Sequence, residues 1–367
     1  MKSILSLVVL ILMTPLIVTS KGLAAPSDPD PKSAAASHLV LVTLDGLRWQ
    51  ELFTGADPLL LAHPAYTHRR PLMEQKYWRA DAMARRETLL PFFWGTLANQ
   101  GVIYGNRNLG NRANVTNRQW FSYPGYNEIL TGAADASIVS NAKVLNENIT
   151  ILEWLNQQPG FSGRVAAFAS WDVFPFIIND VRSGIPVNAG FQTADPPRDA
   201  REAWLNTLQQ QTPSPWASVR LDVFTHHYAL EHLKNESPRV LYVAYGETDD
   251  FAHHGEYDQY LDAAHRTDGF LQDLWQQIQT DPRTRDKTAM VVTTDHGRGS
   301  GGQWTDHEIG IDGADQIWLA MIGPGVPALG EASKNEQLWQ DQVAATVAEL
   351  LGFTPGLPNM GPSIFAD

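Results

Sequence analysis

Residues 293 to 297 carry the most chemically informative segment of the sequence, Thr-Thr-Asp-His-Gly, in which Asp295 and His296 are adjacent. The apolar run from Met290 to Val292 comes directly before it and is typical of a buried strand. A carboxylate and an imidazole are therefore expected where a parallel sheet opens to solvent. Such a pair is a candidate metal site, with a turn-capping aspartate beside a surface histidine as the alternative. A further histidine, His307, follows a glycine-rich passage.

A second carboxylate and imidazole pair follows the apolar run from 240 to 245. Asp249 and His253 are four residues apart, which places both side chains on one face of a helical turn, where one metal could bind both. Asp250 and His254 have the same spacing, so spacing alone does not choose between the two pairs. A polar helix start with a capping aspartate and solvated histidines is the alternative interpretation.

Ser122 is expected near the N-terminus of a helix that contains Pro124 in its first turn and ends at Gly132. The ordinary role of such a serine is to cap the helix by accepting from backbone amides. The functional role would be that of a nucleophile, held by a metal and facing an anion that the helix dipole attracts. Asp45 adds another carboxylate, because it directly follows an apolar run from 38 to 44.

The elements that must position these residues alternate between buried strands and amphipathic helices. This alternation predicts an α/β fold with a mostly parallel central sheet and helices on both faces, so that functional groups gather at the carboxyl ends of strands. The predicted strands are 38–44, 164–169, 239–245, 288–294 and 316–322, and the predicted helices include 149–157, 257–280 and 336–351. Two segments interrupt the pattern, 48–86 and 177–216, and we expect them to be cap-like insertions that select the substrate.

The first residues of the chain have the composition of an export signal. Lys2 is followed by an apolar run from Ile4 to Val18 and by small residues, which predicts a secretory signal peptide over residues 1–25, with a retained N-terminal anchor as the alternative. Residues 26–37 are expected to be a linker, and residues 38–367 a single catalytic domain. We therefore expect a periplasmic or secreted protein with no stable membrane insertion once the signal is cleaved.

Composition excludes some kinds of chemistry and some kinds of partner. The 367 residues contain no cysteine, which excludes a thiol nucleophile and disulfide bonds. The formal net charge of −13 disfavours nucleic-acid polymers and anionic membranes as partners. A small anionic substrate remains compatible with this charge, because bound divalent cations would reverse the local field.

Taken together, these motifs resemble those of the alkaline phosphatase superfamily, and most closely its type I phosphodiesterase/nucleotide pyrophosphatase group. Each motif is weak alone, but their order and their positions at strand ends span residues 38 to about 325. The resemblance rests on Asp45, on Ser122-x-Pro with Thr131-Gly132 downstream, on Glu247-x-Asp249-xxx-His253, on Asp295-His296-Gly297 and on His307.

The resemblance implies a two-metal hydrolase of small-molecule phosphoesters, a phosphatase or phosphodiesterase, that forms a phosphoserine on Ser122. It selects the Asp249 and His253 pair over Asp250 and His254. Carboxylate and imidazole ligands suit Zn²⁺, and Mn²⁺ is also possible. The implied ligands are Asp249, His253 and His307 for one metal, and Asp45, Ser122, Asp295 and His296 for the other.

Two residues are candidates for binding the substrate. Asn141 lies where the resembling group has an asparagine that contacts a phosphoryl oxygen, although Asn148 competes for this role and a turn position is the ordinary alternative. Arg48, just after Asp45-Gly46, is expected to face the anion, with a surface ion pair as the alternative.

Departures from the relatives define the alternative functions. Sulfatases commonly carry an arginine where this chain has Tyr126, and paired acids where it has Asp45-Gly46, so a sulfatase-like hydrolase is the lesser alternative. Phosphoryl or phosphoethanolamine transfer on the same fold is another. The last is a noncatalytic metal-binding relative, which the retention of Ser122 and all the candidate ligands disfavours. Because the nucleotide pyrophosphatase group usually has threonine at Ser122, the sequence does not predict nucleotide specificity.

Overall fold

The computed structural model describes residues 35–354 and 356–366. The predicted signal peptide, residues 1–25, and the predicted linker up to residue 34 lie outside the described residues. Ala36, within the predicted linker, is buried, and its N–H donates to the carbonyl of Leu350 at 2.8 Å. The packed domain therefore includes residues that precede the predicted boundary at 38.

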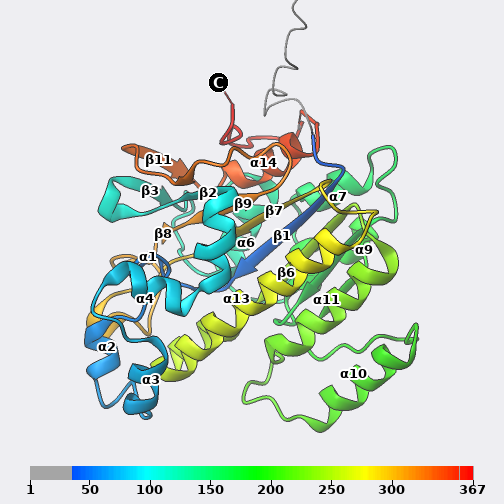
Figure 1. Ribbon diagram of the computed structural model, residues 1–367. Helices are drawn as coiled ribbons and strands as arrows, with labels where there is room; N and C mark the ends of the chain where they lie inside the picture. The colour runs from blue at the N-terminus through cyan, green and yellow to red at the C-terminus, as the bar shows by residue number, and fades with distance from the viewer. Residues whose placement is uncertain (1–34, 355, 367) are drawn as a thin grey trace, which may run out of the picture. The chain divides into compact units, whose positions relative to one another are not determined.

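A mostly parallel eight-stranded sheet forms the centre of the domain (Figure 1). Strand β1 lies between β6 and β7 and is parallel to both, whereas β9 runs antiparallel to its neighbours β7 and β2. The order across the sheet is β10 (Gly330–Glu331), β2 (Gly101–Tyr104), β9 (Leu319–Ile322), β7 (Thr288–Thr293), β1 (His38–Leu44), β6 (Val240–Tyr245), β4 (Val165–Ala169) and β5 (Val187–Ala189).

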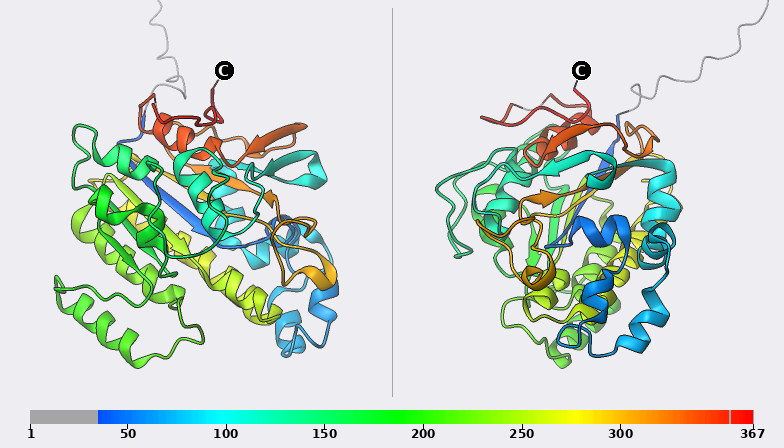
Figure 2. Two further views of the ribbon diagram at one scale, coloured as in Figure 1. Left: turned by 180° about the vertical axis from the view of Figure 1, so that it is seen from behind. Right: turned by 90° about the vertical axis from the view of Figure 1, so that its left-hand side faces the viewer.

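Two apolar cores cover the two faces of this sheet. Because side chains alternate along a strand, Val40 and Val42 of β1 pack into one core, whereas Leu39 and Leu41 pack into the other. Figures 1 and 2 show α11 and α13 along the first face, with α14 across the second. The first core includes side chains of α1 (Trp49–Thr54), α4 (Ala82–Leu89), α11 (Asp222–Glu236) and α13 (Tyr257–Thr280). The second includes side chains of α6 (Ser122–Thr131), α7 (Ile151–Asn156), α8 (Phe174–Ile178) and α14 (Gln342–Leu350).

The predicted fold class, an α/β fold with helices on both faces of a mostly parallel sheet, is confirmed. Two of the predicted elements need correction. The run 316–322 is two strands in different sheets, β8 (Gln316–Ile317) and β9, and the predicted helix 336–351 begins as strand β11 (Glu336–Trp339) before α14. Strands β11, β3 (Asn111–Asn114) and β8 form a small second sheet.

The two predicted insertions have different structures. Residues 48–86 contain α1, α2 (Pro58–Ala62), α3 (Arg70–Tyr77) and most of α4. Residues 177–216 contain α9 (Asp180–Ser183) and α10 (Ala200–Gln211), and also the edge strand β5, so part of this segment belongs to the central sheet. Within the described residues, no helix combines the length and apolar character needed to cross a membrane.

Short helices and turns connect several of the strands. The π-helical turn η2 (Phe93–Leu97) and helix α5 (Ala98–Gln100) lead into β2, and the 3-10 turn η3 (Arg107–Leu109) leads into β3. Helix α12 (Glu247–His253) follows β6, and the 3-10 turn η4 (Gly301–Gln303) lies in the loop after β7. The candidate site is built from the loop after β7, helix α12, the turn after β1 and the start of α6.

Candidate active site

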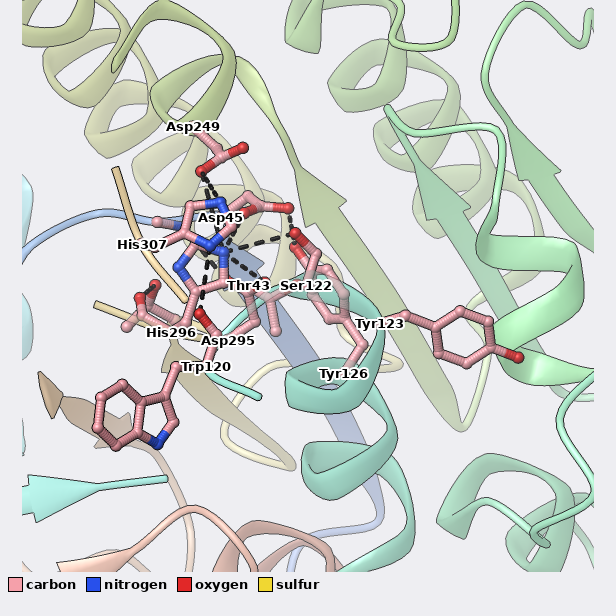
Figure 3. Close-up of polar contacts among 12 residues, drawn as sticks. Thr43, Asp45, Trp120, Ser122, Tyr123, Tyr126, Asp249, Asp295, His296 and His307 are labelled. Atoms are coloured by element: carbon pink, nitrogen blue, oxygen red, sulfur yellow. Dashed lines mark hydrogen bonds and ion pairs between the residues drawn. The ribbon is translucent and has the colours of Figure 1, made fainter. Parts of the chain in front are cut away.

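Three adjacent parallel strands deliver the carboxylates of the site to one edge of the sheet. Thr43 of β1 pairs with Thr293 of β7, so that Asp45 and Asp295, each two residues further on, emerge together. On the other side of β1, strand β6 ends at Tyr245 and leads into α12, which carries Asp249. Figure 3 shows these side chains converging with His296, His307 and Ser122. The site thus lies at the carboxyl ends of the strands, as parallel α/β topology favours.

Asp45, Asp295 and His296 form the first cluster. Asp45 Oδ1 and Asp295 Oδ2 each lie 3.4 Å from His296 Nε2, and the three side chains are buried. These two carboxylate oxygens are also buried, and neither has a hydrogen-bond partner in the part of the chain that the structure describes. Because an unpaired buried carboxylate oxygen is costly, their convergence on an imidazole nitrogen fits a bound cation.

Backbone carbonyls orient two histidines so that Nε2 of each ring faces the clusters. His296 Nδ1 lies 2.8 Å from the carbonyl of Gly297, and His307 Nδ1 lies 3.2 Å from the carbonyl of Trp120. A carbonyl can only accept, so each Nδ1 donates, and each Nε2 keeps its lone pair. Partners of this kind commonly orient histidine ligands in metal sites.

Asp249 and His307, with His296 shared, form the second cluster. Asp249 Oδ1 lies 3.9 Å from His296 Nε2 and 3.8 Å from His307 Nε2. His253 Nε2 lies 2.9 Å from His307 Nε2 and 3.2 Å from Asp249 Oδ2. The residues expected on one metal, Asp249, His253 and His307, therefore lie together. His254, of the competing pair, is exposed, and its Nδ1 contacts the Asp250 carbonyl of the same helix.

The electrostatics of the two clusters differ. Burial, and then repulsion from Asp249, raise the pKa of Asp45 well above its usual range, and burial followed by the charge of Asp45 does the same to the pKa of Asp295. Burial also pushes the pKa of Asp249 upward, but the Arg298 guanidinium and His253 outweigh it and hold that pKa well below its usual range. Arg298 also lowers the pKa of Asp45, but burial and Asp249 outweigh it, whereas its direct ion pair with Asp249 dominates in the second cluster.

Arg298 contacts the candidate site although the sequence analysis did not identify it. Its side chain is buried and forms an ion pair with Asp249, and its Nε donates to the carbonyl of Trp304 at 3.0 Å. The available signal was its position directly after Asp-His-Gly in a glycine-rich loop. Spacing does not reveal that the loop folds back and turns this guanidinium toward α12.

Ser122 is the first residue of α6, and its Oγ lies 3.4 Å from His296 Nε2. All ten residues of this helix are buried, and Gly125 lets its backbone approach the carbonyl of Asp295, where a Cβ would overlap the oxygen. The hydroxyl of Tyr126 donates to Asp45 Oδ2 at 2.8 Å. Helix α6 therefore holds the candidate nucleophile directly against the first cluster.

Gly46 occupies the turn between Asp45 and the rest of the site. Its φ of +58° lies in the left-handed region, and a Cβ there would come within 2.8 Å of Asp249 Oδ1. Its N–H donates to Asp295 Oδ1 at 3.1 Å. Only glycine suits this position, because it lets the two clusters approach each other.

The two predicted substrate-binding residues have different surroundings. Asn141 is exposed, and its Oδ1 accepts from the N–H of Tyr123 at 2.9 Å, so it lies beside the start of α6. Arg48 is fully buried, pairs with Glu51, and donates to the carbonyl of Gly299 at 3.0 Å. The expectation that Arg48 faces the anion is therefore corrected. Its guanidinium forms an ion pair with Glu51 inside the protein and holds the loop after β7 through the bond to Gly299.

The mostly parallel sheet with helices on both faces is an α/β fold of the alkaline phosphatase type, and comparisons with known proteins agree. Residues 65–340 match the model of the type I phosphodiesterase/nucleotide pyrophosphatase family. The chain belongs to this family, and hence to the alkaline phosphatase superfamily, which confirms the resemblance seen in the sequence. No curated protein matches the chain.

Solved structures show the same fold at low sequence identity. The alkaline phosphatase PafA is 10% identical with a TM-score of 0.60, and the match covers 89% of this chain and 98% of PafA. The lipoteichoic acid synthase LtaP from Listeria monocytogenes is 15% identical with a TM-score of 0.57, covering 93% of this chain and 78% of LtaP. The 2-O GAG sulfatase BT1596 is 13% identical with a TM-score of 0.57, covering 90% and 73% of the two chains.

Proposed function

We propose that this protein is a metal-dependent phosphoester hydrolase in which Ser122 is the nucleophile. The observation that carries the proposal is the position of the Ser122 hydroxyl, at the start of a buried helix and 3.4 Å from His296 Nε2, beside two unpartnered carboxylate oxygens. Superfamily members use divalent metals, and the donor set fits them. Zn²⁺ is our proposed ion, with Mn²⁺ as the second choice.

The residues that would hold metal fall into two sets. Asp45, Asp295 and His296, with Ser122, form one set, and Asp249, His253 and His307 form the other. Bound divalent ions would stabilise the serine alkoxide and neutralise charge on the phosphoryl and leaving-group oxygens.

The Ser122 hydroxyl would release its proton to solvent, its oxygen would attack phosphorus, and the bond from phosphorus to the alcohol oxygen would break. The electron pair leaves with that oxygen, which takes up a proton to release the alcohol. A phosphoserine remains, and water then attacks its phosphorus, restores the Ser122 hydroxyl and releases phosphate or a monoester. The N-terminus of α6 favours this chemistry, because its dipole and free amides attract the anionic group.

Asn141 would contact the substrate once the substrate displaces it from the helix. Its Oδ1 accepts from the N–H of Tyr123, the amide next to the nucleophile. A phosphoryl oxygen could take over that N–H, and the side-chain amide of Asn141 could then donate to the same phosphoryl group. This exchange would give Asn141 the role that the family resemblance implies.

Phosphoester rather than sulfate ester hydrolysis is supported by Tyr126. This residue stands where sulfatases commonly carry an arginine, and its buried hydroxyl is used to hold Asp45. The position therefore provides no cation for a sulfate group. Export of the protein is proposed on the composition of residues 1–25 alone, and N-terminal sequencing of the mature protein would test it.

The test compares Ser122→Ala with the wild type on p-nitrophenyl phosphate, bis-p-nitrophenyl phosphate and p-nitrophenyl sulfate, each with Zn²⁺ or Mn²⁺. We expect turnover of a phosphoester and a loss of about a thousandfold or more in kcat for Ser122→Ala. Acid quenching during turnover should trap phosphate on the peptide that contains Ser122. Ser140→Ala, at an exposed loop serine, is the matched control and should keep full activity. Full activity in Ser122→Ala, or preferred turnover of the sulfate, would refute the proposal.

A further inference from the structure

The first and second clusters differ in whether their carboxylate oxygens already have hydrogen-bond or ion-pair partners. In the first cluster, Asp45 Oδ1 and Asp295 Oδ2 are buried and have no hydrogen-bond partner among the described residues. In the second, Asp249 Oδ1 pairs with Arg298 and Asp249 Oδ2 lies 3.2 Å from His253 Nε2. A cation at the first cluster would provide a partner for two buried carboxylate oxygens. At the second cluster it must displace interactions that Asp249 already makes.

The Arg298 guanidinium is fixed beside the second position. It is buried, Nε donates to the carbonyl of Trp304 at 3.0 Å, Nη2 donates to the carbonyl of Thr305, and Nη1 donates to Asp249 Oδ1. Its donors therefore bind two backbone carbonyls of the loop after β7 as well as the carboxylate. Moving the guanidinium aside would leave those carbonyls unpaired, so it cannot swing away at low cost.

Arg298 also determines which nitrogen of His253 carries a proton. Arg298 Nη2 lies 3.3 Å from His253 Nδ1, and a guanidinium can only donate, so Nδ1 is the acceptor. The proton of a neutral His253 is then on Nε2, which donates to His307 Nε2 at 2.9 Å. In this arrangement neither nitrogen of His253 offers a free lone pair to a metal.

We propose that the two positions bind metal unequally, with one ion held tightly by Asp45, Asp295 and His296, and a second held weakly because Arg298 occupies the charge-compensating role beside Asp249 and His253. The inference rests on the proposed function, because it concerns the same site. A fixed positive charge in contact with Asp249 repels a dication there, whereas within the described residues no arginine or lysine forms an ion pair with Asp45 or Asp295. Arg298 is therefore a positioning residue that sets the metal content of the site.

The experiment measures metal content directly rather than turnover. Metal-free protein is titrated with Mn²⁺ in a calorimeter, and the bound ions are followed by electron paramagnetic resonance. We expect one ion per chain to bind first, a second to bind at least about tenfold more weakly, and no spin coupling at one equivalent. Arg298→Gln removes the charge while keeping an amide donor, and it should tighten the second site about tenfold or more.

Three controls make the result specific. Arg298→Lys keeps the positive charge and should retain the wild-type inequality. Arg220→Gln replaces another fully buried arginine, one whose contacts are with Thr225, Asn188 and Gln192, and should leave metal binding unchanged. Circular dichroism and thermal unfolding establish that each variant is folded.

Several outcomes would overturn the inference. Two ions of equal affinity in the wild type would contradict it, as would a folded Arg298→Gln protein whose second site is no tighter. If Arg298→Gln does not fold, the wild-type titration and Arg298→Lys still decide the question. Equal sites with phosphoester turnover would refute this inference alone, whereas unequal sites with no turnover of any phosphoester would refute the proposed function alone.

Discussion

Tyr126 fixes the orientation of Asp45, because its buried hydroxyl donates to Asp45 Oδ2 at 2.8 Å. This bond leaves Asp45 Oδ1 as the unpartnered atom that faces His296. Loss of a residue that orients a metal ligand typically lowers metal affinity by about 10-fold to 100-fold. Tyr126 therefore belongs to the site although it contributes no metal-binding atom.

Replacing Tyr126 by phenylalanine should weaken binding at the first cluster while the fold is kept. The ring packs against Phe174 in the core, and phenylalanine preserves that packing. We expect metal affinity to fall by about 10-fold to 100-fold, because Asp45 would lose the donor that orients it. Calorimetric titration of the metal-free variant measures the change.

Tyr123→Phe is the matched control for this substitution. Tyr123 lies on the same helix, but its side chain points away from the clusters (Figure 3), and its hydroxyl donates to the carbonyl of Val144. The variant should keep wild-type metal affinity. Equal losses in both variants would mean that Tyr126 acts only through the packing of α6.

The candidate site could be predicted from the sequence where residue type and strand position decide it. Asp45, Asp249, Asp295 and His296 follow recognisable strands closely, and Ser122 begins a helix, so their meeting at one edge of the sheet could be predicted. His253, at the end of α12, and His307, late in the loop after β7, were assigned by the family resemblance. Arg48 and Arg298 could not be assigned in this way. An arginine has no characteristic spacing, and its role depends on which carboxylates and carbonyls the tertiary fold brings to it.

At the scale of elements, the close approach of α6 to the end of β7 brings the nucleophile to the first cluster. Gly125 allows this approach, because a Cβ at that position would overlap the carbonyl oxygen of Asp295. The sequence shows only that a glycine stands near the start of a predicted helix. The need for glycine comes from Asp295, which follows a strand far away in the sequence, so it is seen only in the structure.

Gly125→Ala should therefore move α6 and displace Ser122. We expect destabilisation of about 1–3 kcal/mol from overpacking and a loss of about a hundredfold in kcat, since small misplacements of a reacting group are costly. Urea unfolding and steady-state turnover measure the two effects.

Gly269→Ala is the control for the intrinsic effect of glycine in a helix. Gly269 lies within α13, and no atom comes within 4 Å of the position that its Cβ would take. Alanine there should stabilise the protein by about 0.5–1 kcal/mol and leave turnover unchanged. A Gly125→Ala protein with wild-type activity would show that α6 tolerates displacement.

The predicted elements are confirmed where a run of residues forms one continuous element. They are wrong where the run is divided between two elements, as in 316–322 and 336–351. Residues 316–322 look uniform in sequence, yet Trp318 separates β8 from β9, and the two strands join different sheets. Residues 336–351 begin in an extended strand that pairs with β3. Pairing with distant strands decided both cases, and local periodicity does not contain that information.

At the scale of the whole molecule, the segment 48–86 packs on the loop that leads to His307. Trp304 of that loop is fully buried, with its ring centroid 5.5 Å from that of Tyr66 and 5.2 Å from that of Tyr257. Arg48 bonds the same loop at Gly299. The expected role of 48–86 in substrate selection stays a prediction, and a structural role in supporting the second cluster is added to it.

The raised pKa values of Asp45 and Asp295 couple metal binding to the stability of the entire domain. In the metal-free protein, burial favours the protonated carboxyls, and so does the charge of Asp249 on Asp45 and of Asp45 on Asp295, whereas the unfolded chain releases these protons near its ordinary pKa of about 4. Above that pH the folded state binds more protons than the unfolded state, so stability falls as pH rises. The pKa of Asp249 is lowered, so this group affects stability only below a pH of about 4, where stability falls as the pH decreases.

We therefore expect chelator-treated protein to melt at a lower temperature near pH 8 than near pH 5.5. Adding Zn²⁺ should restore the stability that is lost at high pH, because the metal binds the ionised carboxylates. At a Zn²⁺ concentration about 100 times the Kd, binding adds roughly 2.7 kcal/mol to the free energy of unfolding. The rise in Tm on metal addition should thus be larger near pH 8, by several degrees or more. Asp295→Asn removes one titrating carboxyl, so its metal-free form should show a smaller fall in Tm between the two pH values. If the metal-free wild type and Asp295→Asn lose the same Tm over this interval, buried carboxylate repulsion is not what the metal relieves.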